Sequence, residues 1–348
     1  YGAKGSWINS NYKTVNGVMK SRLENPDLKW ETTSEWNLGI DFGFLKNRIS
    51  GSIELYQRTI SDLLNYKPLN TYQEVKQIMA NVGQTRSRGI ELTLNTHNIQ
   101  TKDFNWSTGF TFSKYEDKWK ERTPDWKPNV YEKVNDPIRA IYARRADHIL
   151  QIGEPVPAAQ PNLRPGQIVI KDLNGYVRDS NGNPKVDENG RFMLSGQPDG
   201  KIDEADTELI GTTDPGWMAS MTNSFRYKGF DFGFMFNGMF DRIMLDPTDM
   251  EYGLGATGIA KMGYNALRSV KDRWTFENPS TTRPSSNYLR GINYTAGDFF
   301  YQKAWFIRMQ NISLGYTLPK SLIAKTKVLS NVRFHASVNN LFVITPYK

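Results

Sequence analysis

Two acidic stretches near the middle of the chain contain the residue types that bind calcium. The tetrapeptide DLNG occupies 172–175, and the octapeptide DGKIDEAD occupies 199–206. Joined end to end, they give D-x-N-x-D-G-x-I-x-x-x-D, which has the oxygen-ligand spacing of an EF-hand or dockerin-type loop with glycine at the sharp turn. The pattern predicts a calcium site formed by Asp172, Asn174, Asp199, the carbonyl of Lys201, Asp203 and Asp206.

This loop departs from the usual pattern in two ways. Residues 176–198 separate its two halves and contain two Asn-Gly turn signals, so we expect them to form a hairpin extruded from the loop. The last ligand position holds Asp206 instead of a bidentate glutamate. The alternative interpretation is that Asp, Asn and Gly only form turns here. A bound metal would stiffen a loop and would not catalyse a reaction.

Catalytic motifs are absent from the sequence. It contains no G-x-S-x-G, no Walker loop and no H-E-x-x-H, and His97, His148 and His335 are far apart. The absence of cysteine excludes disulfides, thiolate metal sites and cysteine nucleophiles. Glu54 and Glu91 could act as paired acids, but lining a polar surface explains them better. The sequence therefore predicts a protein that is not an enzyme.

The elements that must position these residues are strands with one apolar and one polar face. In 34–44, SEWNLGIDFGF, every second residue from Leu38 to Phe44 is apolar, although the mean hydropathy of the chain is −0.59. Side chains alternate between the two faces of a strand, so this pattern predicts β-structure. The pattern recurs in about eight stretches: 34–44, 48–56, 89–95, 104–113, 217–225, 230–240, 311–319 and 332–340.

The connections between these strands favour a membrane barrel over a soluble β-sandwich. Short and long connections alternate, which places every long loop at one end of the sheet, as in outer-membrane barrels. Sandwiches have turn signals at both ends. The longest loops are 118–216, which contains the calcium pattern, and 241–300. In the second loop, Ile259, Met262, Ala266 and Val270 recur at helical spacing and predict a short helix over 258–274.

Charge and terminal sequence add two expectations. The net charge of +8 arises from 44 basic and 36 acidic residues that are interspersed, which argues against nucleic-acid binding. The first residues, YGAKGSWINS, have neither the pattern of a signal peptide nor the look of a natural start. We therefore expect a piece of a longer protein.

Four segments together resemble the SusC/RagA family of TonB-dependent outer-membrane transporters. They are NPDLKWETTSEWNLGIDFGFLKNRISGSIELYQRTISDLL, NVGQTRSRGIELTLNT, the acidic region that ends DGKIDEADTELIGTTDPGW, and FIRMQNISLGYTLPKSL, and the final VNNLFVITPYK resembles the family's last strands. The resemblance implies a 22-stranded barrel in the bacterial outer membrane, a plug domain, a SusD-like surface lipoprotein and energy from TonB. It implies that 1–348 are the C-terminal part of the barrel, with the plug absent and TonB contacted through missing N-terminal regions.

This resemblance predicts import of oligomeric nutrients, with glycans as the first cargo class and peptides as the second. Trp119, Trp126 and Tyr131 are the candidate cargo-binding aromatics, because such side chains often stack on sugars at wet sites. Packing between loops would explain them equally well. The predicted helix over 258–274 would pack on the barrel mouth or dock the lipoprotein. The alternative function is a calcium-stiffened β-sandwich that binds carbohydrate or mediates adhesion.

Overall fold

The main feature of the fold is one antiparallel sheet. The computed structural model describes residues 2–8, 14–20, 23–69, 72, 75–123, 126–188, 190–254, 263–286, 296–326 and 328–347, with only the backbone for 2–8 and 14–20. Its eight strands lie in the order β18-β17-β14-β13-β8-β7-β4-β3, so β18 and β3 are the edges of an open sheet. The strands are β3 (Thr32–Phe44), β4 (Ile49–Ser61), β7 (Gly83–Gln100), β8 (Phe104–Arg122), β13 (Trp217–Tyr227), β14 (Phe230–Phe240), β17 (Phe306–Thr317) and β18 (Arg333–Ile344). The predicted all-β fold with about eight barrel strands is confirmed.

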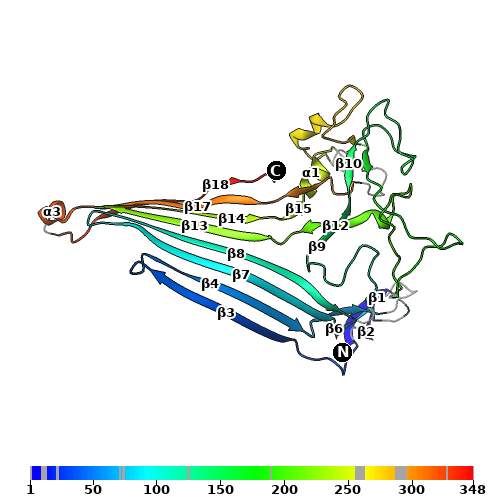
Figure 1. The fold of residues 1–348 in the computed structure, drawn as a ribbon, viewed down its shortest axis with the longest axis horizontal. Coiled ribbons are helices and arrows are strands. Elements are labelled where there is room, and N and C mark those ends of the chain that lie inside the picture. The colour runs from blue at the N-terminus through cyan, green and yellow to red at the C-terminus, as the bar shows by residue number, and fades with distance from the viewer. Residues whose placement is uncertain are drawn as a thin grey trace.

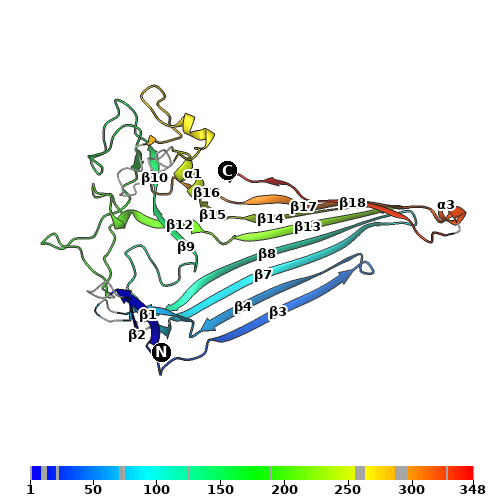
Figure 2. The ribbon, with the colours of Figure 1, turned by 180° about the vertical axis from the view of Figure 1, so that it is seen from behind.

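The connections alternate between the two ends of the sheet as the sequence predicts. At one end, 45–48, 101–103 and 228–229 are tight turns, and 318–332 contains the short helices α3 (Lys320–Ile323) and η4 (Ala324–Thr326). At the other end lie the β5–β6 hairpin (Leu64–Pro68 and Gln77–Asn81) and the connections 123–216 and 241–305. Figures 1 and 2 show these long connections gathered at the end of the sheet opposite α3.

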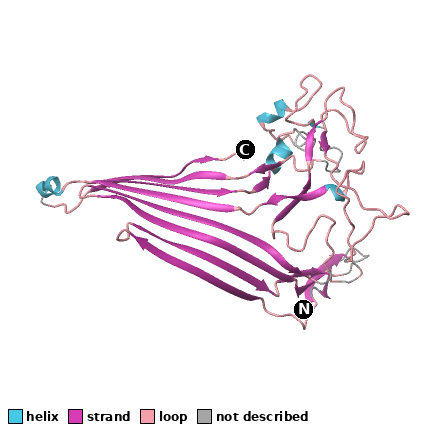
Figure 3. Ribbon diagram, viewed as in Figure 1, coloured by secondary structure: helices cyan, strands magenta, loops and turns pink. Residues whose placement is uncertain are grey.

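Short elements order the long connections, as the colouring in Figure 3 shows. The antiparallel pairs are β9 (Ala140–Arg144) with β12 (Thr207–Thr212), β10 (Ala146–Ile149) with β11 (Ile168–Ile170), and β15 (Ile243–Leu245) with β16 (Tyr301–Lys303). Near the N-terminus, β1 (Gly2–Ile8) pairs with β2 (Thr14–Lys20). The 3₁₀ helix η1 covers Glu204–Asp206.

The helix predicted over 258–274 lies only partly within the described residues. Ile259 and Met262 lie outside the described residues, and the described remainder is helical only in the 3₁₀ helix η2 (Arg268–Asp272). Leu267 precedes η2 and offers no side-chain cap, so the described part of this segment has no capped helix start. The same connection contains the α-helix α1 (Pro247–Tyr252), which begins where Asp246 caps the backbone N–H of Asp249 at 2.8 Å. None of the described helices is long and apolar enough to cross a membrane.

Strand register assembles the apolar side chains of the sheet into rows on one face. One row runs through Leu94, Phe110, Met221, Phe236, Met309 and Phe342 on six successive strands. No second layer of the described chain covers this face, and Leu38 and Ile40 are 59% and 63% exposed. A soluble sandwich would bury such a face against another sheet. The sandwich alternative is therefore wrong, and the face fits a lipid environment.

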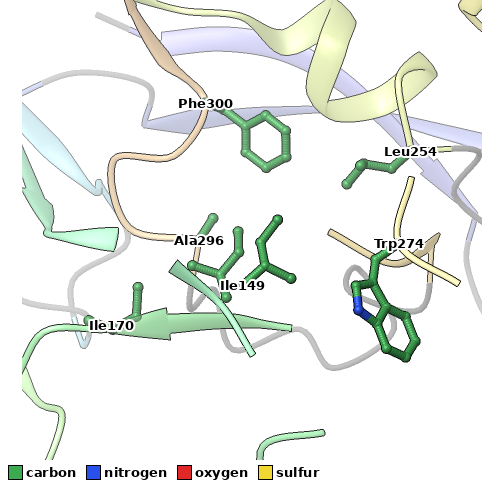
Figure 4. Packing of buried hydrophobic residues seen from close by; sticks show 7 residues of the cluster. Ile149, Ile170, Leu254, Trp274, Ala296 and Phe300 are labelled. Atoms are coloured by element: carbon green, nitrogen blue, oxygen red, sulfur yellow. The ribbon is translucent and has the colours of Figure 1, made fainter. Parts of the chain in front are cut away.

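The two long connections share a hydrophobic core of their own. Ile149 and Ile168, from the first connection, pack with Leu254, Trp274 and Phe300, from the second. Figure 4 shows Ile149, Leu254, Trp274 and Phe300 converging from separate segments. We call the connections 123–216 and 241–305 together the cap. Because one hydrophobic core joins the two connections, the cap is a single packed substructure at the end of the sheet and does not consist of independent loops.

Candidate functional site

The face opposite the apolar rows is polar. Glu54 and Glu91 are direct cross-strand neighbours there, as expected for the polar lining. Thr111 and Ser220 hydroxyls hydrogen-bond across β8 and β13 at 2.8 Å. A cavity of about 400 Å³ lies along this face, and its polar lining consists of Glu91, Thr93, Thr111, Ser113, Ser220 and Asn237. This polar face therefore presents hydrogen-bonding groups to a molecule bound beside it.

The structure brings together the two halves of the calcium pattern. Asp172 accepts the backbone N–H groups of Asp199, at 3.2 Å, and Gly200, at 2.7 Å. Asp206 is completely buried and accepts the N–H groups of Leu173, at 2.7 Å, and Asn174, at 3.1 Å. These bonds join segments that residues 176–198 separate in the sequence. The intervening residues form bridged hairpins, with Tyr176 opposite Leu194 and Val186 opposite Phe192, as predicted.

The fit of this loop to calcium is partial. Gly200 adopts a φ of +81°, the left-handed turn expected of the glycine in such a loop. Asp203, however, caps η1 by accepting from Ala205 at 2.8 Å, and Asp206 accepts from the N–H of Asp203 at 2.9 Å. Among the described residues, no three acidic or histidine side chains form a group that could hold a metal. Calcium binding through Asp172, Asn174, Asp199, Lys201, Asp203 and Asp206 stays a prediction.

The candidate cargo-binding aromatics lie in the cap and at the strand end beneath it. The guanidinium of Arg122 lies over the rings of Trp119, at 4.2 Å, and Trp126, at 4.7 Å. Tyr131 packs on Tyr142 with ring centroids 5.1 Å apart, and burial raises the pKa of Tyr131. All three candidates are half-buried. Internal packing thus occupies part of each surface, and a role in cargo binding stays a prediction.

Polar contacts that the sequence patterns did not reveal hold the cap together. Arg145 binds Asp298 at 2.9 Å, and the backbone N–H of Ala146 donates to the same carboxylate at 2.8 Å. The hydroxyl of Tyr142 donates to buried Asp136 at 2.5 Å, and burial together with this contact raises the pKa of Tyr142. No local spacing signals the contacts of Asp298, because Arg145 and Ala146 are 153 and 152 positions away from it in the sequence.

His148 occupies a charged cluster on the outside of the cap. Its Nδ1 lies 2.9 Å from Asp147 and its Nε2 lies 2.6 Å from Glu154. Lys171 pairs with the other oxygen of Asp147 at 3.3 Å. Burial alone would lower the pKa of His148, but the two carboxylates outweigh it and raise the pKa. The cluster therefore favours the imidazolium form.

Comparison with known proteins identifies the family of this sheet. A family model described as TonB dependent receptor-like, beta-barrel matches residues 4–341. The chain therefore belongs to the TonB-dependent receptor β-barrel family, whose members are outer-membrane proteins. This confirms the predicted location, and it confirms that the chain is not an enzyme because the family consists of transporters.

Particular relatives confirm the resemblance to SusC/RagA proteins. TonB-dependent receptor P3 of Formosa agariphila is 29% identical over 371 residues, covering 100% of this chain and 34% of P3. TonB-dependent receptor SusC of Bacteroides thetaiotaomicron is 28% identical over 349 residues, covering 96% of this chain and 31% of SusC. The chain thus spans about a third of the length of these relatives.

A solved structure supports the fold independently. The structure of the RagAB peptide transporter matches with a TM-score of 0.73 at 21% identity, and the match covers 100% of this chain and 35% of that chain. At this level of identity the match shows the fold alone. It agrees with an open sheet that forms part of a larger barrel.

Proposed function

We propose that this chain forms part of the wall and cap of an outer-membrane transporter that imports oligomeric nutrients with energy from TonB. The observation that carries the proposal is the two-sided sheet, apolar outside and polar inside, with a built cap at the end that holds every long connection. Such asymmetry is the arrangement of barrels whose long loops face the outside of the cell. The family match supports transport as the activity of the whole protein.

The proposed partner is a SusD-like surface lipoprotein that closes over the cap. The similarity to SusC and to RagAB, whose name joins two components, supports a two-component system. The cap offers this partner a rigid surface, because its two connections share the core around Ile149, Leu254 and Trp274. TonB would act through regions of the protein outside this chain.

The proposed cargo class is a glycan, with peptide as the second candidate. Trp119, Trp126 and Tyr131 at the mouth support an aromatic contact with sugar rings. The similarity to RagAB, described as a peptide transporter, supports the second candidate.

The experiment that tests this function uses the full-length protein purified from outer membranes in detergent. We expect it to co-purify with a lipoprotein and to bind oligosaccharides in calorimetry, and we expect loss of its gene to abolish growth on the bound oligosaccharide. Binding of peptides but not of oligosaccharides would show that the cargo class is peptide and not glycan. A protein that purifies alone, and whose loss changes the uptake of neither class, would contradict the proposal.

A further inference from the structure

The outward face of β7 and β8 changes from apolar to basic near the cap. Alternation keeps Lys114, Glu116 and Lys118 on the same side of β8 as Phe110 and Phe112. On β7 the side chains that precede Ile90 on this face are arginines. The cross-strand pairs that carry the change are Ile90 with Lys114, Arg88 with Glu116, and Arg86 with Lys118. We call Arg86, Arg88, Lys114 and Lys118 the basic patch.

The basic patch carries excess positive charge. Glu116 is the acidic side chain in these rows, and it is shared by Arg88 and by Lys118, whose Nζ lies 2.8 Å away. Within the described part of the chain, neither Arg86 nor Lys114 has an ion pair. The side chain of Arg88 remains 54% exposed in spite of its pair, and Lys114 is also exposed. The patch can therefore accept an external anion.

A pocket lies where the patch meets the apolar rows. It has a volume of about 570 Å³, and Trp36, Leu55 and Ile90 line it beside Arg88 and Lys114. Register places Leu55 and Ile90 in the same row as Lys114, and Trp36 in the next row toward the cap, which contains Arg88. Trp36 is 54% exposed at this boundary. The pocket therefore places a cation beside apolar side chains in both rows, and the apolar row of Ile53, Leu92 and Phe112 lies one step further from the cap.

The position of the pocket identifies the environment that it meets. β7 and β8 have β4 and β13 as their neighbours, so strands that pair with the edges β3 and β18 would extend the wall without covering this face. The level at which the apolar rows end on the cap side is the level of the outer-leaflet headgroups. Clustered Lys and Arg side chains attract anionic headgroups, and guanidinium groups bind phosphate oxygens through paired hydrogen bonds.

We propose that this pocket binds a phosphate-bearing lipid of the outer leaflet. The phosphate contacts Arg88 and Lys114, and an acyl chain lies against Trp36, Leu55 and Ile90. Such a lipid would fix the height of the wall in the membrane on the side of the barrel formed by β7 and β8. This proposal requires the outer-membrane location and does not depend on the cargo or on transport.

Native mass spectrometry of the delipidated full-length protein, with lipid A added as the probe, tests the proposal. We expect the double variant Arg88→Gln/Lys114→Gln to bind lipid A roughly tenfold more weakly, because two cations near the headgroup are lost. The matched control, Lys185→Gln/Lys271→Gln, removes two exposed lysines from the cap and should bind like the wild type. Dephosphorylated lipid A should bind the wild type as weakly as lipid A binds the double variant.

Variants must first show the heat-modifiable gel mobility of a folded barrel. Lys114→Gln alone, which breaks no ion pair of the described chain, serves if the double variant fails to fold, and it should weaken binding by several-fold. Equal binding by patch and control variants would overturn the proposal. So would displacement of lipid A by excess inorganic phosphate, which would indicate a small-anion site. Dissociation of a dimer in the lipid-free double variant would assign the pocket to a second copy of the chain and would also overturn it.

Discussion

The backbone N–H of Leu173 donates to the buried carboxylate of Asp206 at 2.7 Å. This bond joins two segments of the cap across the hairpins at 176–198, and the second oxygen of Asp206 holds the N–H of Asp203. Asp206 thus holds the two ends of the loop together, and residues 176–198 take no part in these hydrogen bonds.

Replacing Asp206 by alanine should open this loop locally. Its partly buried N–H partners would lose their acceptor, which costs roughly 2 kcal/mol and should speed amide exchange at Leu173 and Asn174 by about thirtyfold. Glu204→Ala removes an exposed carboxylate from the same turn and should leave exchange unchanged. Equal exchange in the two variants, measured by hydrogen–deuterium exchange, would show that Asp206 does not hold the loop.

The calcium prediction has a separate outcome. If the loop binds calcium, millimolar Ca²⁺ should slow amide exchange over 199–206 relative to EDTA. Asp172→Asn should abolish that difference, because this residue supplies the first ligand and also accepts from Asp199 and Gly200. Identical exchange in Ca²⁺ and EDTA would leave Asp172 and Asp199 as turn-forming residues.

A cargo role for the aromatic cluster predicts a binding defect in Trp126→Ala. We expect several-fold weaker oligosaccharide binding, because each stacked aromatic contributes about 1 kcal/mol or more. Phe276→Ala removes an aromatic that is 73% exposed elsewhere in the cap and provides the control. Unchanged calorimetric affinity, together with faster exchange around Arg122, would assign Trp119 and Trp126 to loop packing.

The His148 cluster should make the stability of β10 depend on pH. The pKa of His148 is raised, so its stabilising contribution is complete below 6.5, its unfolded value, and is lost as pH rises through the folded value. The pKa values of Asp147 and Glu154 are lowered, so their contributions are lost as pH falls below about 4.5. Local stability should therefore be greatest between about pH 4.5 and 6.5.

Hydrogen exchange over Ala146–Ile149, corrected for intrinsic rates, measures this dependence. We expect weaker protection at about pH 8.5 than at about pH 5.5, and His148→Gln should remove the difference. A pH dependence that survives in His148→Gln would place the titrating group elsewhere.

Sequence patterns predicted the sheet well because burial of one face imposes a period of two. For β14, the alternating stretch 230–240 coincides with the strand. For β7 and β8, alternation indicated only 89–95 and 104–113, whereas the strands cover Gly83–Gln100 and Phe104–Arg122. Their upper parts carry charged residues such as Arg88 and Glu116 on the outward face, so the hydrophobic signal ends before the hydrogen-bonded strand does.

Prediction was weaker for the candidate site. The calcium pattern placed Asp172 and Asp199 in one loop, and the two residues are in contact in the structure. The pattern could predict this contact because the spacing of residues in a turn is fixed, once residues 176–198 are recognised as an insertion. The contact of Arg145 with Asp298 joins residues 153 positions apart, and no periodicity encodes it. The helix over 258–274 was inferred from apolar spacing alone, and its described part is helical only over Arg268–Asp272. Apolar spacing did not indicate α1, which starts where Asp246 and Pro247 provide a cap and a first helical residue.

The central claim is that one face of this sheet meets lipid and the other meets the interior of a barrel. Met221 and Thr222 are consecutive on β13, both are exposed in this chain, and they point to opposite faces. This chain contains no cysteine, so single cysteines can be introduced along 218–225 of the full-length protein and spin-labelled once any cysteine elsewhere in that protein has been replaced.

Electron paramagnetic resonance of these labels in lipid bilayers is the most direct measurement. We expect accessibility to dissolved oxygen to alternate with a period of two, with a maximum at Met221→Cys and a minimum at Thr222→Cys. Uniform low oxygen accessibility at both positions, or a maximum at Thr222→Cys, would contradict the assignment of the apolar face to lipid.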